Sequence, residues 1–263
     1  MAIQSRITAA FCGPEALGAK TSGLLEGDFF AQTNENINLF RLRHAFIKLK
    51  WEKTELLTGQ YWNPMFVTEC YPGTVSFSAG APIQGLARNP QIRLSHQISN
   101  VKLTAAALGQ RDFVDNGPEG RSSIYLRNAG IPEVQVQAQL ALKGLLIGGG
   151  MGYKTIVPRL SADHNQKTYK VDESVTSVSA LAFAKITTKP VTLKFQAKYG
   201  ENNLDMLAPS GYAVRSVVDQ ETGEQAYTPL TNVSFWSEIH TNGQKFQAGV
   251  FAGVLKNRGT KKK

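Results

Sequence analysis

Charged side chains recur at every second residue in several short segments of this 263-residue chain. Arg41 and Arg43 form one such pair, and Glu26 and Asp28 form another. Residues i and i+2 of an extended strand project from the same face, so each pair would line one side of a sheet. Rows of charge on one face attract or repel passing ions, which is the chemistry of a channel wall.

The spacings that catalysis or metal binding require are not found in the sequence. The histidines (His44, His96, His164 and His240) show no metal-ligand spacing, and there is no nucleophile elbow or P-loop. The glycine-rich run Gly148–Gly152 lies within a strand hairpin and is not followed by a helix, so it does not form a dinucleotide cradle. We therefore expect no enzyme activity, no catalytic residue, no metal and no cofactor.

The stretch from Ile131 to Val157 shows which elements would position the charged rows. Between residues 134 and 142 valine, alanine and leucine alternate with glutamine, and Lys143-Gly144 then offers a tight turn into a second alternating segment. A period of two predicts strands with one apolar and one polar face. Because the polar face carries uncharged glutamines, it suits a wet interior. The pattern predicts a hairpin of a membrane-spanning barrel, with the apolar side toward lipid.

The rest of the chain repeats this organisation. Roughly twelve strands of about 9 to 12 residues emerge, the length needed to cross a bilayer at a tilt. Short turns at 52–54, 99–100, 143–144 and 241–243 alternate with longer polar loops, as in outer-membrane barrels. We expect an all-β protein, an antiparallel transmembrane β-barrel that forms a single domain over residues 1–263 and can be incomplete at both ends.

Alternation also assigns charged residues to the water-filled side of this barrel. Their basic members would raise the local concentration of anions and disfavour cations. The expected pore-lining and substrate-binding residues are Arg41, Arg43, Arg93, Lys194 and Lys198, with Glu26 and Asp28 as opposing carboxylates. The alternation also places Glu238 on the lumen face, opposite these cations.

The segment from Leu39 to Trp51 fits the alternation less well. Leu42 and Phe46 share its apolar face, yet His44 and Lys48 fall on that face too. On a lipid-facing side a charge is tolerable only near the head groups, where it costs about 0 to 1 rather than 2 to 4 kcal/mol.

One long connection interrupts the alternation of strands and short turns. The segment 63–90 contains Pro64, Pro72, Pro82 and Pro90 together with several glycines. A connection of that length is unusual unless it is functional. It is a candidate constriction loop that folds into the lumen, and an outer loop fits the sequence equally well.

Composition narrows the classes further. No run of eighteen apolar residues exists, which excludes a transmembrane helix. The net charge of +9 would suit nucleic acid, but the basic residues follow the strands and form no stripe with interleaved aromatics, so no nucleic-acid partner is expected. The first residues lack the apolar core of a signal peptide, and a disulfide between Cys12 and Cys70 stays open.

Three motifs carry a resemblance to a known family. They are R-L-R-H-A-F-I-K-L from Arg41, L-L-T-G-Q-Y-W-N-P from Leu56, and R-N-P-Q-I-R-L-S from Arg88. In these the chain resembles the DcaP-like trimeric outer-membrane porins of Gram-negative bacteria, in a Bacteroidota-like version. The resemblance implies a sixteen-stranded barrel, a homotrimer in outer-membrane lipid, and passage of small anionic solutes such as dicarboxylates. This chain is shorter than the family pattern and lacks a final aromatic strand, which a truncated copy explains.

Two further hypotheses compete with an anion-conducting porin. A soluble β-barrel or sandwich that binds a ligand or a partner protein would bury the face of Val191, Leu193 and Phe195 in a core. A structural barrel of the outer membrane would share the fold and conduct nothing.

Overall fold

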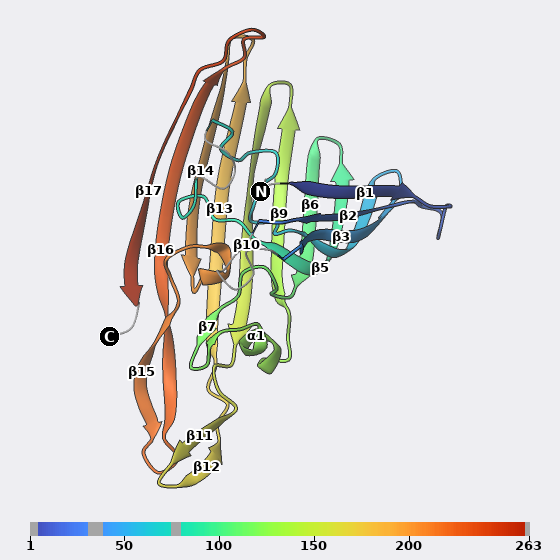
Figure 1. Ribbon diagram of the computed structural model, residues 1–263. Helices are drawn as coiled ribbons and strands as arrows, with labels where there is room; N and C mark the ends of the chain where they lie inside the picture. Colours follow the sequence, from blue (N-terminus) through green and yellow to red (C-terminus); the bar gives the residue numbers. More distant parts are fainter. Residues whose placement is uncertain (1–4, 31–38, 75–79, 261–263) are drawn as a thin grey trace.

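The chain folds into one curved antiparallel sheet (Figure 1). The computed structural model describes residues 5–30, 39–74 and 80–260, and within them thirteen strands form a single sheet. Neighbours in the sheet follow the order of the chain, and the long strand β16 pairs with β15 along its first part and with β17 along its second. The bounds are β1 Arg6–Cys12, β2 Lys20–Asp28, β3 Arg41–Lys50, β4 Thr54–Trp62, β5 Arg88–Ile98, β6 Val101–Leu108, β9 Glu133–Leu142, β10 Leu145–Ile156, β13 Val175–Thr187, β14 Val191–Glu201, β15 Tyr212–Asp219, β16 Glu224–Thr241 and β17 Gly249–Thr260.

Small elements occupy the connections. Two short hairpins, β7–β8 and β11–β12, and the five-residue helix α1 interrupt the loops after β6 and β10. Among the described residues no helix is long and apolar enough to cross a membrane. The bounds are β7 Asn116–Gly117, β8 Gly120–Arg121, α1 Ile124–Asn128, β11 Ser161–His164, β12 Lys167–Lys170 and, for a 3-10 turn, Leu204–Met206.

The two ends of the sheet differ, as the sequence predicts. Six connections of up to seven residues lie at one end, called here the tight-turn end: 13–19, 51–53, 99–100, 143–144, 188–190 and 242–248. In Figure 1 the turns of the later hairpins are at the top, and the 13–19 connection is at the right. The long segments 63–87, 109–132, 157–174 and 202–211 lie at the opposite end, called here the loop end. Residues Asn242-Gly243 open a seven-residue connection and not the two-residue turn that the dipeptide favours.

The two faces of the sheet have inverted polarity. On the convex face of β9, Val134 and Val136 are 45% and 50% exposed, whereas Gln135 on the concave face is 2% exposed. Met151 and Tyr153 of β10 and Phe235 and Ile239 of β16 likewise expose apolar groups. A soluble sheet covers its apolar face, so an apolar exterior around a polar interior indicates a barrel wall in lipid.

A β-bulge in β3 corrects the sequence prediction for that strand. Glu26 of β2 pairs with His44 and Gly27 pairs with Leu42, which leaves Arg43 as an extra residue. Beyond such a bulge the alternation changes parity. His44 and Lys48 therefore face the concave side with Phe46, and the expectation that they face lipid was wrong; Leu42 and Phe46 do not share a face.

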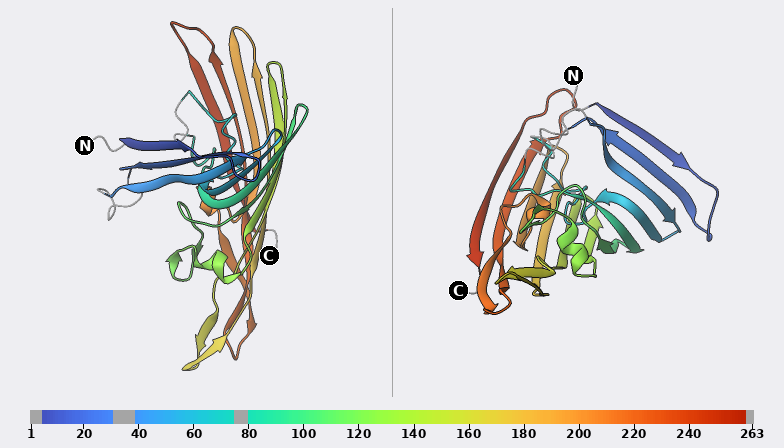
Figure 2. Two further views of the ribbon diagram at one scale, coloured as in Figure 1. Left: turned by 90° about the vertical axis from the view of Figure 1, so that its right-hand side faces the viewer. Right: turned by 60° about the horizontal axis from the view of Figure 1, so that its bottom comes forward.

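The sheet is shaped like a trough. Within the described residues, β1 pairs only with β2 and β17 pairs only with β16, so these strands are its two edges. Figure 2 shows the long loops and α1 lying in the hollow between the N-terminal and C-terminal strands. Every concave residue is therefore either open to this hollow or covered by a loop.

The polarity of the convex face gives a first testable expectation. Phe235→Arg, in the middle of the β14-paired part of β16, should lower the free energy of unfolding by about 2 to 4 kcal/mol, because the charge would sit at bilayer depth. Val250→Arg changes an equally apolar convex residue beside the 242–248 connection and should cost about 0 to 1 kcal/mol. Urea titrations in lipid vesicles measure both, and equal costs would contradict a membrane position for this face.

Candidate functional site

The described residues of the segment 63–87, which are 63–74 and 80–87, lie across the concave face and contact the far wall. The Trp236 indole Nε1 donates to Gln84 Oε1 at 2.6 Å, and the Cys70 thiol donates to the carbonyl oxygen of Ala184 at 3.5 Å. Both partners are separated from the segment by more than 100 residues of sequence. An apolar cluster fills the space between segment and wall and consists of Met65, Val67, Cys70, Ala87, Leu181, Phe183, Met206 and Trp236.

Both cysteines are free thiols. Burial raises the pKa of Cys70 to about 11, so this thiol is neutral at physiological pH.

A buried carboxylate fixes the tip of this segment to the wall. Glu238 of β16 is 1% exposed, and its Oε2 accepts the backbone N–H groups of Gly73 at 2.5 Å and Thr74 at 2.8 Å. Its Oε1 accepts from Lys194 Nζ at 2.9 Å, and the same ammonium donates to the Tyr71 carbonyl oxygen at 2.9 Å. Lys194 is thus used to hold the segment. The alternation places Glu238 on the lumen face, but no pattern in the sequence indicated its partners in the segment.

The glycine run of β10 makes room for this packing. A Cβ atom on Gly148 would lie 2.5 Å from the ring of Phe183, and one on Gly152 would lie 3.4 Å from the Met65 side chain. Side chains at these concave positions would push both groups away from the wall. The glycines therefore serve close approach of neighbouring groups.

The predicted residues of β2 and β3 form one ion-pair ladder. Asp28 accepts from Arg41 Nε at 2.7 Å and from Arg43 Nη1 at 2.8 Å. Arg43 also donates to Glu26 at 2.7 Å. Arg43 is 4% exposed, whereas the Arg41 side chain is 20% exposed to the hollow. Arg43 thus pairs with both carboxylates of the ladder, whereas the Arg41 side chain is partly exposed to the hollow.

Two further arginines stand on β5. Arg93, a predicted site residue, lies apart from the ladder; it donates to the Trp62 carbonyl oxygen and to Gln91 Oε1 at 2.8 Å, and stacks over the Tyr61 ring at 5.2 Å. Arg88, which begins the third sequence motif but was not predicted to line the pore, is 2% exposed and donates to Asp112 at 2.5 Å. Burial raises the pKa of Asp112, and the Arg88 charge opposes that rise.

Aromatic rings fill the gaps between these cations. The His44 ring lies 5.3 Å from both the Tyr61 and the Trp62 rings, and Trp62 lies 4.6 Å from Phe66 of the segment 63–87. The guanidinium of Arg88 lies over Trp62 at 5.3 Å. The G-Q-Y-W motif noted in the sequence is the part of this cluster that residue spacing could have revealed.

A second buried charge cluster ties two other loops to the wall. Lys154 of β10 donates to Asp115 at 3.0 Å, to Asp205 at 2.9 Å and to the Asn202 carbonyl oxygen at 2.7 Å. Gln110 donates to both carboxylates, at 2.7 and 3.2 Å. Burial, with the nearby Asp205 carboxylate, raises the pKa of Asp115 to about 6 despite the Lys154 charge. No spacing in the sequence links these groups.

Lys198 lies on the same wall and is 7% exposed. Its strand position faces the hollow, as the alternation predicts, but loops cover it. The Arg41 side chain on the N-terminal strands, at 20% exposure, is more open to the hollow than Lys198.

The N-terminal strands β1 to β5 and the loop-covered wall, strands β9 to β16, differ in their balance of charge. From β1 to β5 the described concave charges include five arginines (Arg6, Arg41, Arg43, Arg88 and Arg93) and four carboxylates from strands and loop (Glu26, Asp28, Glu55 and Asp112). On the covered wall the carboxylates outnumber the lysines. The open side of the hollow is consequently positive, which attracts anions.

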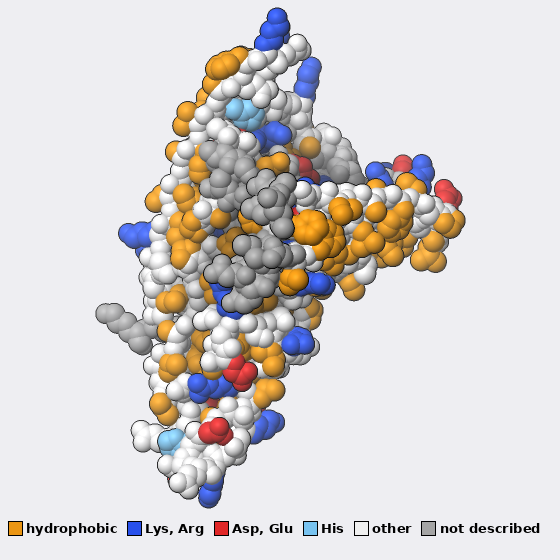
Figure 3. Space-filling view, in the orientation of Figure 1, with side chains coloured by type: hydrophobic (Ala, Val, Ile, Leu, Met, Phe, Trp, Pro, Cys, Tyr) orange, Lys and Arg blue, Asp and Glu red, His pale blue; other side chains and the backbone are white. Residues whose placement is uncertain are grey.

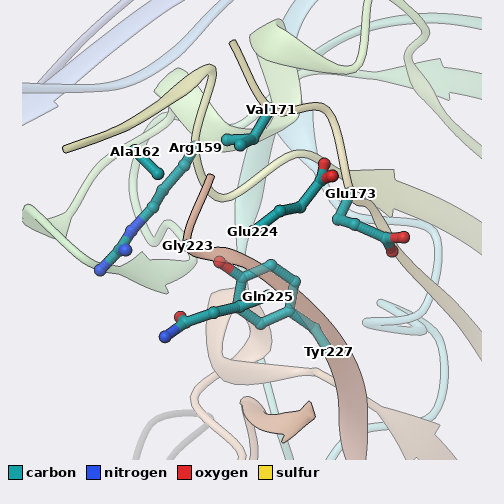
Figure 4. A pocket seen from close by; sticks show the side chains of 8 residues that line it. All are labelled: Arg159, Ala162, Val171, Glu173, Gly223, Glu224, Gln225 and Tyr227. Atoms are coloured by element: carbon teal, nitrogen blue, oxygen red, sulfur yellow. The ribbon is translucent and has the colours of Figure 1, made fainter. Parts of the chain in front are cut away.

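The described residues hold no cluster of three or more His, Cys, Asp or Glu that could bind a metal. A shallow depression at the loop end, between the β11–β12 hairpin and β16, brings Arg159, Glu173, Glu224 and Tyr227 near one another. Figure 4 shows the Arg159 side chain pointing away from both carboxylates, so these groups do not converge on one reacting atom.

Comparison with known proteins bears on the fold. No family model and no curated protein matches the sequence. The crystal structure of the outer membrane channel DcaP of Acinetobacter baumannii is similar, with a TM-score of 0.71 and 16% identity over 98% of this chain and 68% of that chain. Outer-membrane-expressed OmpT of Vibrio cholerae gives a TM-score of 0.50 and 10% identity over 96% of this chain and 74% of that chain. This chain therefore has the fold of the outer membrane channel DcaP, an antiparallel β-barrel wall with an apolar exterior and a charged interior.

Proposed function

We propose that the protein is an outer-membrane channel of a Gram-negative bacterium that lets small anionic solutes diffuse through its hollow. The observation that carries this proposal is the inverted polarity of the curved sheet, whose exterior is apolar and whose interior is charged. A wall with this polarity separates lipid from a wet passage. The fold likeness to an outer membrane channel supports the same reading.

The passage would run along the N-terminal strands, where Arg41 and Arg93 add positive charge that the nearby carboxylates do not fully offset. Guanidinium groups stay charged at any working pH and bind carboxylates through two parallel hydrogen bonds. Small carboxylates, dicarboxylates among them, are therefore the solute class that we propose. Several partly exposed sites release an anion more readily than one buried site.

The segment 63–87 would form the narrowest part of this passage. Its support is the set of contacts that hold it inside the hollow: Glu238 and Lys194 at its tip, Gln84 on Trp236, and the apolar cluster beneath. A segment anchored at several points can restrict a passage without moving aside.

A complete barrel also needs partners for its edges. In lipid each unpaired backbone group costs several kcal/mol, so β1 and β17 need strands beside them. A trimer of such barrels in outer-membrane lipid is part of the proposal.

A soluble binding protein is less consistent with these observations. It would bury the face of Val191, Leu193 and Phe195, yet those residues lie half-buried on the convex face beside the exposed Phe235 and Ile239. A non-conducting structural barrel shares the fold, and conductance separates it from a channel.

Reversal potential tests the proposal. The purified protein in planar bilayers across a KCl gradient should give an anion-selective reversal potential. Arg41→Gln should move this potential toward zero by roughly 5 to 10 mV, because it removes an open positive charge from the passage. Arg41 is the informative choice because Asp28 keeps its Arg43 partner at 2.8 Å, so the ladder survives.

Two controls bracket this measurement. Arg41→Lys keeps the charge and should keep the selectivity. Arg215→Gln removes an exposed arginine of β15, away from the hollow, and should leave the reversal potential unchanged. A cation-selective wild-type channel would refute the anion proposal, and folded protein without conductance would favour the structural barrel.

A further inference from the structure

Positive charge is concentrated at the tight-turn end of the sheet. Figure 3 shows Lys and Arg side chains at the tips of the tall hairpins at the top of the molecule. In the six tight-turn connections, or within three residues of them, the charged residues are nine lysines (Lys20, Lys48, Lys50, Lys53, Lys102, Lys143, Lys185, Lys189 and Lys245) and three glutamates (Glu15, Glu52 and Glu55).

The loop end lacks this excess of positive charge. In its four long segments, or within three residues of them, ten carboxylates stand against eight basic residues. The two mouths of the hollow thus differ in their charge balance. The local concentration of a given ion, such as chloride, therefore differs between the two mouths.

Strand register places several rim lysines on the concave face. Lys20 pairs directly with Lys50 across β2 and β3, and Lys102 pairs with Gln139 on the same side as Gln137, which donates to the Pro64 carbonyl oxygen inside the hollow. Lys185 pairs with Lys194, whose ammonium also points inward. Lysines from four strands thus surround the tight-turn mouth from within.

Part of this rim is hollowed. A recess of about 300 Å³ is lined by Lys50, Lys53 and Lys102 together with the hydroxyls of Thr54 and Ser95. The carboxylates of Glu52 and Glu55 also line it, and Glu55 is held by Lys48 at 3.2 Å. Ammonium and hydroxyl donors in one recess suit a hydrated anion.

We propose that the tight-turn mouth is an anion-collecting vestibule, which makes conduction asymmetric and favours anions that enter from this side. The inference rests on the proposed channel function and deepens it. The rim consists of lysine and not arginine, and lysine is a strongly hydrated point charge that does not grip carboxylates in a fork. Such a rim raises the local anion concentration without holding each anion. Carboxylates and inorganic anions share this chemistry.

Single-channel recording in neutral phosphatidylcholine bilayers tests the vestibule and removes any effect of anionic lipid. Streptavidin added to one side reports orientation through a biotin placed in the β11–β12 hairpin. At ~0.1 M KCl the current should be about twofold larger when voltage drives chloride in through the tight-turn mouth. At ~1 M the ratio should fall toward one, because the Debye length shrinks from about 10 to about 3 Å.

Charge variants assign the asymmetry to the rim. The combined variant Lys20→Gln, Lys50→Gln, Lys102→Gln and Lys185→Gln removes the four concave rim lysines and should abolish the asymmetry, whereas the matching set of Lys→Arg substitutions should keep it. Four exposed basic residues of the loop end, Arg121, Arg127, Lys167 and Lys170, changed together to Gln serve as the matched control and should keep or increase it.

The outcomes separate the two proposals. An anion-selective channel with equal currents in both directions at low salt would overturn the vestibule and leave the channel function standing. A folded protein without conductance, or with cation selectivity, would overturn the channel proposal itself, and the vestibule with it.

Discussion

Replacing Lys154 with methionine is expected to lower the free energy of unfolding by about 3 to 5 kcal/mol, because it removes one partner of a buried ion-pair cluster. Lys154 is 4% exposed, and its ammonium is the shared donor of Asp115, Asp205 and the Asn202 carbonyl oxygen. Methionine matches its length but donates nothing. Two carboxylates would then face each other in a site from which water is largely excluded.

The loss should be recovered by removing the charges that lysine neutralises. The variant that combines Lys154→Met with Asp115→Asn and Asp205→Asn replaces charges by neutral amides, and it should regain most of the lost stability. Lys167→Met, on the exposed hairpin strand β12, is the matched control and should change the free energy of unfolding by no more than about 0.5 kcal/mol. Urea unfolding in vesicles compares all three. A Lys154→Met cost as small as the control's would mean that the cluster does not hold the loops.

The regular part of this fold follows from local physics, which is why the sequence predicts it well. The apolar-polar alternation of Val134 to Leu142 needs no knowledge of distant residues, because each strand reports its own two faces. The same alternation correctly indicated that Lys194 faces inward. The difference in length between the two sets of connections was also visible in the spacing of turn residues.

The predictions that were wrong concern residues whose orientation depends on interactions that the alternation of apolar and polar residues does not reveal. The bulge at Arg43 adds one residue to β3 and reverses the faces of His44 and Lys48. The misfit of these two residues in the alternation was its sign in the sequence, but it did not reveal where the extra residue lies. Leu181 and Phe183 face inward although they are apolar, because the segment 63–87 covers them. Such cover depends on contacts across more than 100 residues of sequence.

The same limit explains which charged groups the sequence could bring together. Arg41, Arg43, Glu26 and Asp28 alternate on neighbouring strands, so the sequence places them on one face, and the register brings them together. Lys154 and Glu238 have their partners in distant loops, and those loops carry no periodic pattern. Charged residues that anchor loops therefore require the folded structure, whereas charged residues that line strands do not.

The second large effect concerns the anchor of the segment 63–87. Glu238→Gln should raise single-channel conductance roughly twofold and make it fluctuate, because the narrowest element of the passage would lose its hold on the wall. The amide replaces one acceptor oxygen by an NH₂ group. That group would face either the N–H groups of Gly73 and Thr74 or the Lys194 ammonium, so buried donors would meet a donor, at a cost of about 1 to 3 kcal/mol for each group left unsatisfied.

The Glu238→Gln substitution should destabilise the position of the segment 63–87 and not the barrel wall. The ladder between β14 and β16 runs from Val191 to Glu201 and does not involve the Glu238 side chain, so the wall keeps its backbone pairing. Glu55→Gln is the matched control: Glu55 also faces inward and pairs with a lysine at 3.2 Å, but it stands on β4 at the tight-turn end and not at the tip of the segment. Its conductance should match that of the unaltered protein at ~1 M salt, where rim charges are screened. If Glu238→Gln and Lys194→Met both kept the original, steady conductance, the segment would not be the constriction, and the narrowest part of the passage would have to lie along the arginine ladder of β2 and β3.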